Sequence, residues 1–173
     1  MMMKLTQTNK TLLMVMLLMT LFFQTTPAIA LSDGLMQREI KAKIAHTKLR
    51  RKTQIEVRVV QRLVVLTGQV RLYEQKLIGG RIAWTAAGVF EVENDIQVVP
   101  TVPVSDEAIE LNIRKIIKAD ERFIAAVVEF SVKNGEVRLS GKFANLHDPS
   151  RLKHKVAEIE GVLDITMNAD FIV

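Results

Sequence analysis

A hairpin pattern that occurs twice constrains the fold more than any other feature of this sequence. Within Val128–Gly141, apolar and polar residues alternate on both sides of Asn134-Gly135. Alternation with a period of two predicts strands with one covered face. Asn-Gly predicts the turn between them, because both central residues of a type I′ turn need positive φ. The same alternation recurs, without Asn-Gly, at Ile55–Gly68.

Three landmarks recur at one constant spacing. The pairs that lie 73 residues apart are Asp33 and Asp106, Gly68 and Gly141, and Gly88 and Gly161. A single offset indicates an internal duplication without net insertion, and so long a period predicts two tandem domains rather than a solenoid. The copies are called repeat one and repeat two below.

Helical spacing of apolar residues flanks each hairpin. The predicted helices run from Asp33 to about Lys48, over Tyr73–Ala87, from Asp106 to about Ala119, and over Ser150–Glu160. The predicted closing strands are Val89–Val98 and Val162–Val173. Each repeat is therefore expected to be an α-β-β-α-β unit of the α/β (α+β) class, in which a small three-stranded mixed sheet packs against two helices. The expected domains are residues 31–99 and 105–173, joined by a linker at 100–104 that Pro100 and Pro103 stiffen.

Details of this alignment make further predictions. Ser105 is the expected N-cap of its helix, and Gly88 and Gly161 are the expected left-handed residues at two helix C-termini. Val57 and Phe130 are expected to fill equivalent core-facing positions, because a register error of one residue would turn one of them to the other face.

The first 30 residues have the composition of an export signal. Lys4 and Lys10 precede the uncharged apolar run Leu12–Phe23, and Ala28-Ile29-Ala30 fits a signal peptidase. We expect cleavage after Ala30; the alternative is a retained membrane anchor. The chain has no cysteine, so disulfides, thiolate zinc sites and an acylated cysteine anchor are not expected.

The two repeats differ in charge. Residues 31–99 hold 12 Lys and Arg against 7 Asp and Glu, and residues 100–173 hold 10 against 12. Repeat one thus carries +5 and repeat two −2, which suggests that they differ in function.

Repeat one departs from repeat two at two places. Its turn is Gln61-Arg62, and because both side chains resist positive φ, its turn type or register is expected to differ. Its second helix has Gly79, Ala83 and Ala86 where repeat two has Leu152, Val156 and Ile159. Either Ile78 and Ile82 rotate inward and the helix sits closer to its sheet, or Leu77 and Trp84 contact something outside the repeat.

The hairpin, the following helix ending in Gly-Val and the closing strand resemble the BON domain. The residues that carry the resemblance are Val137, Leu139, Gly141, Gly161 and Val162, and in the first copy Val64, Leu66, Gly68, Gly88 and Val89. Two such domains behind an export signal resemble periplasmic proteins of the OsmY type. The resemblance implies an α/β sandwich, a place in the cell envelope, phospholipid association and a role in envelope integrity or stress tolerance. It implies no catalysis and no cofactor.

Two segments are candidates for lipid contact. Lys48, Arg50, Arg51 and Lys52 form the densest basic run; they fit anionic headgroups, or are cations favoured at a helix C-terminus. Phe123 and Ile124 occupy the matching segment of repeat two, where one of them plugs the core or both form an apolar membrane-contact tip.

No pattern indicates a catalytic or metal site. The only histidines are His46, His147 and His154, and none stands at the spacing of a metal motif. A nucleic-acid partner is not expected, since Trp84 and Tyr73 alone do not make a stacking platform. The favoured function is therefore a non-enzymatic periplasmic envelope-stress or envelope-integrity protein that associates with anionic phospholipid. The alternative is a periplasmic chaperone or protein-interaction module that engages other envelope proteins.

Overall fold

The computed structural model describes residues 32–47 and 54–172. The predicted signal peptide with its cleavage site and the basic run Lys48–Lys52 lie outside the described residues. Within the described part of the chain, no helix has the length and apolar character needed to cross a membrane.

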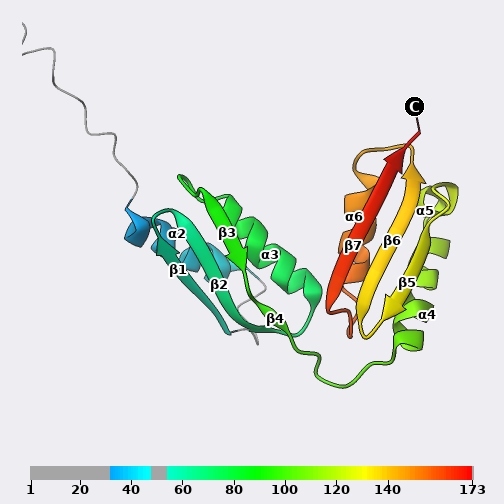
Figure 1. Cartoon of the computed structure of the whole chain (residues 1–173), viewed down its shortest axis with the longest axis horizontal. Helices are drawn as coiled ribbons and strands as arrows, with labels where there is room; N and C mark the ends of the chain where they lie inside the picture. The colour runs from blue at the N-terminus through cyan, green and yellow to red at the C-terminus, as the bar shows by residue number, and fades with distance from the viewer. Residues whose placement is uncertain (1–31, 48–53, 173) are drawn as a thin grey trace, which may run out of the picture. The chain divides into compact units, whose positions relative to one another are not determined.

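Repeat one is built from two helices and a mixed sheet (Figure 1). Its elements are α2 (Asp33–His46), β1 (Gln54–Val60), β2 (Leu63–Val70), α3 (Tyr73–Trp84), β3 (Glu91–Asn94) and β4 (Gln97–Val98). β2 lies in the middle of the sheet, antiparallel to β1 and parallel to both β3 and β4. The predicted closing strand is therefore split into two short strands, with the buried Ile96 between them.

Repeat two has the same order of elements with one addition. Its elements are α4 (Asp106–Lys118), α5 (Glu121–Ala125), β5 (Glu129–Lys133), β6 (Glu136–Phe143), α6 (Asp148–Ala157) and β7 (Asp164–Phe171). β6 is the central strand, antiparallel to β5 and parallel to β7. The short helix α5 stands where the sequence predicted a loop. The predicted caps are confirmed: the Ser105 hydroxyl accepts the Ala108 N–H at 3.3 Å, and Gly88 and Gly161 have φ of 84° and 96°.

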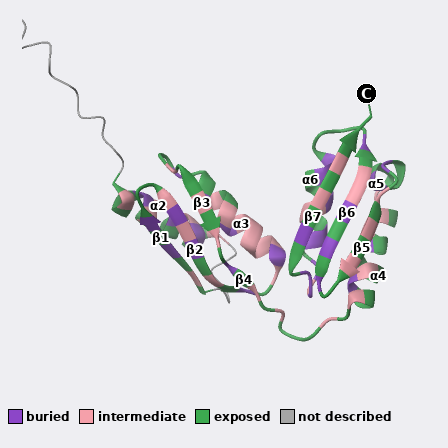
Figure 2. Ribbon diagram, viewed as in Figure 1, coloured by how far each residue is buried: buried purple, intermediate pink, exposed green. Residues whose placement is uncertain are grey.

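The strand registers confirm the internal alignment. Val57 pairs with Leu66 in repeat one, and Phe130 pairs with Leu139 in repeat two, each partner again 73 residues apart. Val57 is buried, and Phe130 packs half-buried against the core of its own repeat. Figure 2 shows this alternation of buried and exposed positions along the strands. The helices repeat it, since α2 buries Met36, Ile40 and Ile44 where α4 has Ile109, Ile113 and Ile117.

The turn of repeat one does not differ in type, contrary to the prediction. Gln61 and Arg62 both have positive φ, at 49° and 67°, as do Asn134 and Gly135 of repeat two at 52° and 76°. The seven residue pairs of β1 and β2 continue up to this turn without a shift. An external hydrogen-bond acceptor, Asp33, holds the turn of repeat one, as argued in the Discussion.

The predicted inward rotation of Ile78 and Ile82 is wrong. Both are half-buried, while Gly79, Ala83 and Ala86 are buried and keep the core-facing positions. The helix approaches its sheet closely, because a Cβ on Gly79 would lie 3.1 Å from the Cδ1 of Ile96.

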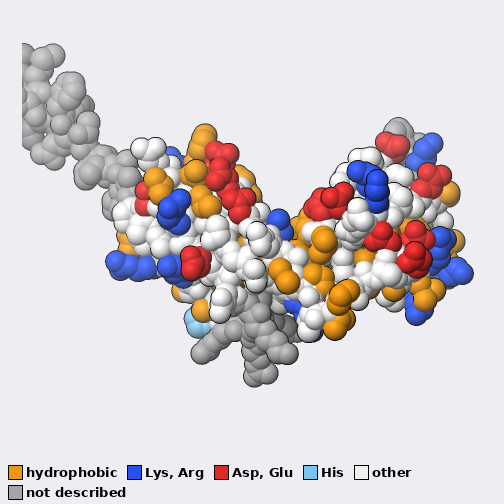
Figure 3. Space-filling model, turned by 60° about the horizontal axis from the view of Figure 1, so that its bottom comes forward, with side chains coloured by type: hydrophobic (Ala, Val, Ile, Leu, Met, Phe, Trp, Pro, Cys, Tyr) orange, Lys and Arg blue, Asp and Glu red, His pale blue; other side chains and the backbone are white. Residues whose placement is uncertain are grey.

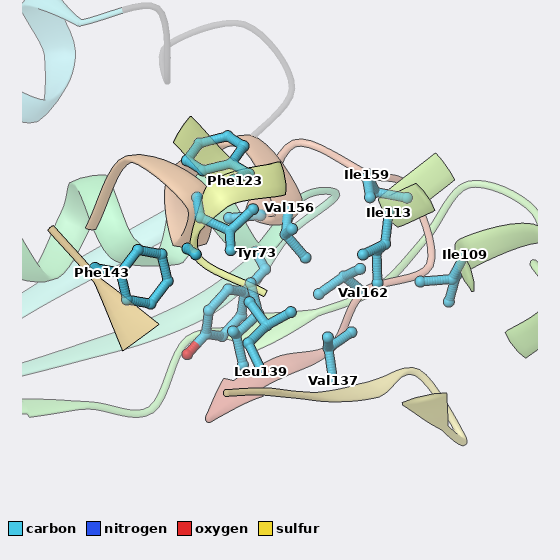
Figure 4. Packing of buried hydrophobic residues seen from close by; sticks show 14 residues of the cluster. Tyr73, Ile109, Ile113, Phe123, Val137, Leu139, Phe143, Val156, Ile159 and Val162 are labelled. Atoms are coloured by element: carbon cyan, nitrogen blue, oxygen red, sulfur yellow. The ribbon is translucent and has the colours of Figure 1, made fainter. Parts of the chain in front are cut away.

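The core of repeat two gathers side chains from all its elements (Figure 4). The labelled members include Phe123 from α5, Leu139 and Phe143 from β6, and Val156 from α6. Tyr73 and the half-buried Leu77, both from α3, pack against this cluster. Leu77 thus contacts residues outside its own repeat, as one of the two predictions for α3 states, whereas Trp84 is 57% exposed.

Candidate functional site

Phe123 and Ile124, the adjacent apolar residues predicted to touch lipid, point in different directions. Asp120 begins α5, and its carboxylate accepts the backbone N–H of Arg122 at 3.2 Å and the Arg122 guanidinium at 2.7 and 2.9 Å. The guanidinium lowers the pKa of Asp120. Within this short helix Phe123 is fully buried, so one of the pair does plug the core, and Ile124 is 55% exposed. Only Ile124 of this pair can meet a membrane.

Four more large apolar side chains are exposed at the same end of repeat two. We call the set the apolar end; its members are Ile124, Val127, Leu146, Phe171 and Ile172. The strand directions bring them together, because β6 and β7 run parallel and both finish there, while β5 starts there and α5 precedes β5.

Backbone hydrogen bonds fix the apolar end. The Lys142 N–H donates to the carbonyl of Ala126 at 2.9 Å, which ties the loop after α5 to the end of β6. The Ile172 N–H donates to the carbonyl of Phe143 at 3.1 Å, which ties the end of β7 to the same place. The exposed apolar side chains therefore project from an ordered frame.

Val127 is the most exposed of these residues and is conformationally strained. It is 74% exposed and has φ of 49°, a value that β-branched residues rarely adopt. Such strain costs on the order of 1–3 kcal/mol and tends to collect at functional sites. Asn or Gly would relieve it, so a valine here is not explained by the stability of the fold.

A shallow, open depression of about 420 Å³ adjoins Val127. Its lining is Val127, Glu129, Ser140, Gly141, Lys142 and Asp170. One cation between two carboxylates does not make a strong anion site. The depression therefore adds a polar border to the apolar end rather than a separate ligand site.

Sequence reasoning missed most of this surface. It singled out Ile124 but not Val127, Leu146, Phe171 or Ile172. These residues stand at element ends, where alternation stops and periodicity no longer tells an inward side chain from an outward one. The basic run lies outside the described residues, so its relation to the apolar end stays a prediction. Among the described residues, no group of three or more His, Asp or Glu is arranged to hold a metal ion.

The comparison with family profiles decides the identity of both repeats. The BON-domain profile matches residues 32–100 and 105–170. The chain belongs to the BON-domain family. BON domains associate with phospholipid and occur in envelope proteins, and the family is in general non-catalytic.

Solved structures give weaker likenesses to this tandem BON protein. One is the C-terminal domain of CdsD, described as the structural protein of the type III secretion system of Chlamydia trachomatis. It is 15% identical, the match covers 82% of this chain and 68% of that one, and the TM-score is 0.33. A second CdsD structure is 14% identical over 96% and 76% of the two chains, with a TM-score of 0.31. A comparison with curated proteins finds no match. The family assignment therefore depends on the profile match.

Proposed function

We propose that this protein is a non-enzymatic periplasmic protein that supports envelope integrity by associating with anionic phospholipid surfaces. The observation that carries the proposal is the apolar end of repeat two. Its exposed side chains are large and apolar, and they stand together on a frame held by hydrogen bonds. Water disfavours such a cluster, whereas the boundary between headgroups and acyl chains accepts it.

The two repeats contribute different forces in this proposal. Ile124, Val127 and Leu146 dip into the interface, where fully burying an aliphatic side chain is worth about 1.5–3 kcal/mol. The basic run of repeat one adds attraction to anionic headgroups, at about 1 kcal/mol for each Lys or Arg near the surface. The first force is insensitive to salt and the second weakens as the Debye length shrinks.

Flotation with phosphatidylglycerol vesicles tests the apolar end. We expect the triple variant Ile124→Ser, Val127→Asn, Leu146→Ser to bind at least about tenfold more weakly than wild type, since a factor of ten needs only about 1.4 kcal/mol. Leu111→Ser is the matched control, because Leu111 is also 55% exposed but lies on α4. Equal binding by the triple variant and the control would remove the role of the apolar end.

The basic run is tested separately. Replacing Lys48, Arg50, Arg51 and Lys52 with Gln is expected to remove up to roughly 4 kcal/mol of attraction at low salt and little at high salt. If wild-type protein does not float at low salt, the lipid proposal fails. The protein-interaction alternative then takes its place, through the unpaired outer edges of β1 and β5.

A further inference from the structure

The hairpin-turn end of repeat one carries a second group of exposed apolar side chains. We call it the turn end; its members are Leu35 at 48% exposure, Val60 at 50%, Trp84 at 57% and Phe90 at 73%. They stand at the start of α2, at the end of β1, at the end of α3 and just before β3. Among the described residues from 33 to 98, these four are all the exposed large hydrophobic ones. Figure 3 shows that hydrophobic side chains reach the surface in patches beside charged ones.

Arg62 holds the turn end together. Its backbone N–H donates to the carboxylate of Asp33 at 3.0 Å, and its carbonyl accepts the N–H of Phe90 at 3.0 Å. Its guanidinium Nε donates to the carbonyl of Gly88 at 2.6 Å. One residue thus joins the start of α2, the hairpin turn and the segment that leads into β3.

Two polar groups of this surface have capacity to spare. In the described part of the chain, Arg62 forms no ion pair, so its remaining guanidinium N–H groups can donate to an anion. The indole N–H of Trp84 likewise has no hydrogen-bond partner among the described residues. A ring that is apolar on its face and needs one acceptor suits the boundary between water and hydrocarbon.

Repeat two provides an internal comparison for this surface. The residues 73 positions after the members of the turn end are Ala108, Lys133, Ala157 and Leu163. Three of the four are small or charged, and Ala157 is fully buried. The fold therefore does not require large apolar side chains at these places, and their exposure in repeat one calls for a partner.

We propose that the turn end of repeat one is a second lipid-contact surface, which takes the interfacial region of a phospholipid bilayer. Trp84 and Phe90 lie at the boundary of headgroups and acyl chains, and Arg62 donates to lipid phosphates. Asp33 and Glu91 border the surface, so its net charge is small and its contact does not depend on an anionic headgroup. This inference rests on the proposed lipid association but assigns it to a surface distinct from both the apolar end and the basic run.

Trp84 is the only tryptophan in the chain, so its fluorescence reports this surface alone. We expect vesicles of phosphatidylcholine and phosphatidylglycerol to shift the emission of wild-type protein to the blue, and brominated lipid to quench it, at low and at high salt. The double variant Val60→Lys, Phe90→Ser is expected to reduce the partitioning that this signal reports about fivefold, which corresponds to about 1 kcal/mol. Lys is the residue that repeat two carries at the first of these positions, so the fold tolerates it. Leu111→Ser is the control and is expected to leave the emission shift unchanged.

The outcomes separate this inference from the proposed function. Protein that floats while the emission of Trp84 stays unshifted and unquenched overturns the turn end as a contact and leaves lipid association standing. A shift that the double variant retains in full also overturns it. Wild-type protein that fails to float at any salt concentration overturns both.

Discussion

Two carboxylates determine how the hairpin turns are held. Asp33 accepts the backbone N–H groups of Gln61 and Arg62 at 2.7 and 3.0 Å. Asp106 accepts those of Asn134 and Gly135 at 2.7 and 2.8 Å. Hydrogen bonds to an ionised acceptor are about twice as strong as neutral ones. In repeat one they offset the strain of two turn residues other than glycine at positive φ.

Removing the carboxylate of repeat one is expected to destabilise the fold. Asp33→Ala leaves two turn N–H groups without their acceptor, and we expect the free energy of unfolding to fall by about 1–3 kcal/mol in a urea titration. Asp106→Ala is expected to cost less, because Asn-Gly favours this turn without help. Changing Gln61-Arg62 to Asn-Gly in the Asp33→Ala background is expected to recover part of the loss. Equal costs for the two alanine variants, without such recovery, would contradict this account of the turn.

These residue contacts were only partly predictable from the sequence. The constant offset identified Asp33 and Asp106 as equivalent, but not that each reaches a turn almost 30 residues further along the chain. Adjacent apolar residues such as Phe123 and Ile124 carry no period, so the sequence could not say which of them points inward. The inward direction depends on the Asp120 cap and the path of α5, which tertiary packing determines.

At the scale of elements, α3 and the strand that follows it exchange volume between the repeats. Gly79 and Ile96 of repeat one stand where repeat two has Leu152 and Ala169. Gly79 is buried and lies close to Ile96, while Leu152 is fully buried in α6. A large side chain on the helix is thus matched by a small one on the strand, and the reverse. The total volume between helix and sheet stays similar, which cores tolerate well.

This exchange makes a prediction about coupling. Gly79→Leu is expected to destabilise repeat one by about 1–3 kcal/mol through overpacking, and Ile96→Ala by about 2–5 kcal/mol through a cavity. The double variant reproduces the arrangement of repeat two, so its loss is expected to be smaller than the sum of the single losses. A double-mutant cycle in urea measures the difference. Additive losses would mean that the two side chains do not share one space.

The elements themselves were largely predictable. Helices and hairpins have long periodic patterns, and the offset of 73 confirmed each by its copy. Helix α5 was missed because five residues make little more than one turn and show no helical period. The break between β3 and β4 was also missed, because the run Val89–Val98 has no proline or glycine to mark it.

At the scale of the whole described chain, one tyrosine joins the two repeats. Residues from Asp33 onward cluster as one compact unit. Tyr73 begins α3 of repeat one but is 6% exposed and packs into the core of repeat two. Its hydroxyl donates to the carboxylate of Asp164 at 2.8 Å. No sequence pattern could have revealed this contact, because Tyr73 and Asp164 are 91 residues apart and belong to different repeats.

The ionisation of Tyr73 tests this contact directly. Burial, and then the bond to Asp164 and its negative charge, raise the pKa of Tyr73 to about 12 from the ordinary value of 10.0. Because the folded pKa lies above the unfolded one, the stabilisation is complete below pH 10 and is lost as the pH rises from 10 toward 12. Tyr73 is the only tyrosine, so tyrosinate absorbance follows it alone, and we expect a midpoint near 12 in folded protein and near 10 in denaturant. Asp164→Asn is expected to lower the folded midpoint only in part, because burial remains. A folded midpoint at the ordinary value would mean that the phenol is exposed and that the repeats are not joined here.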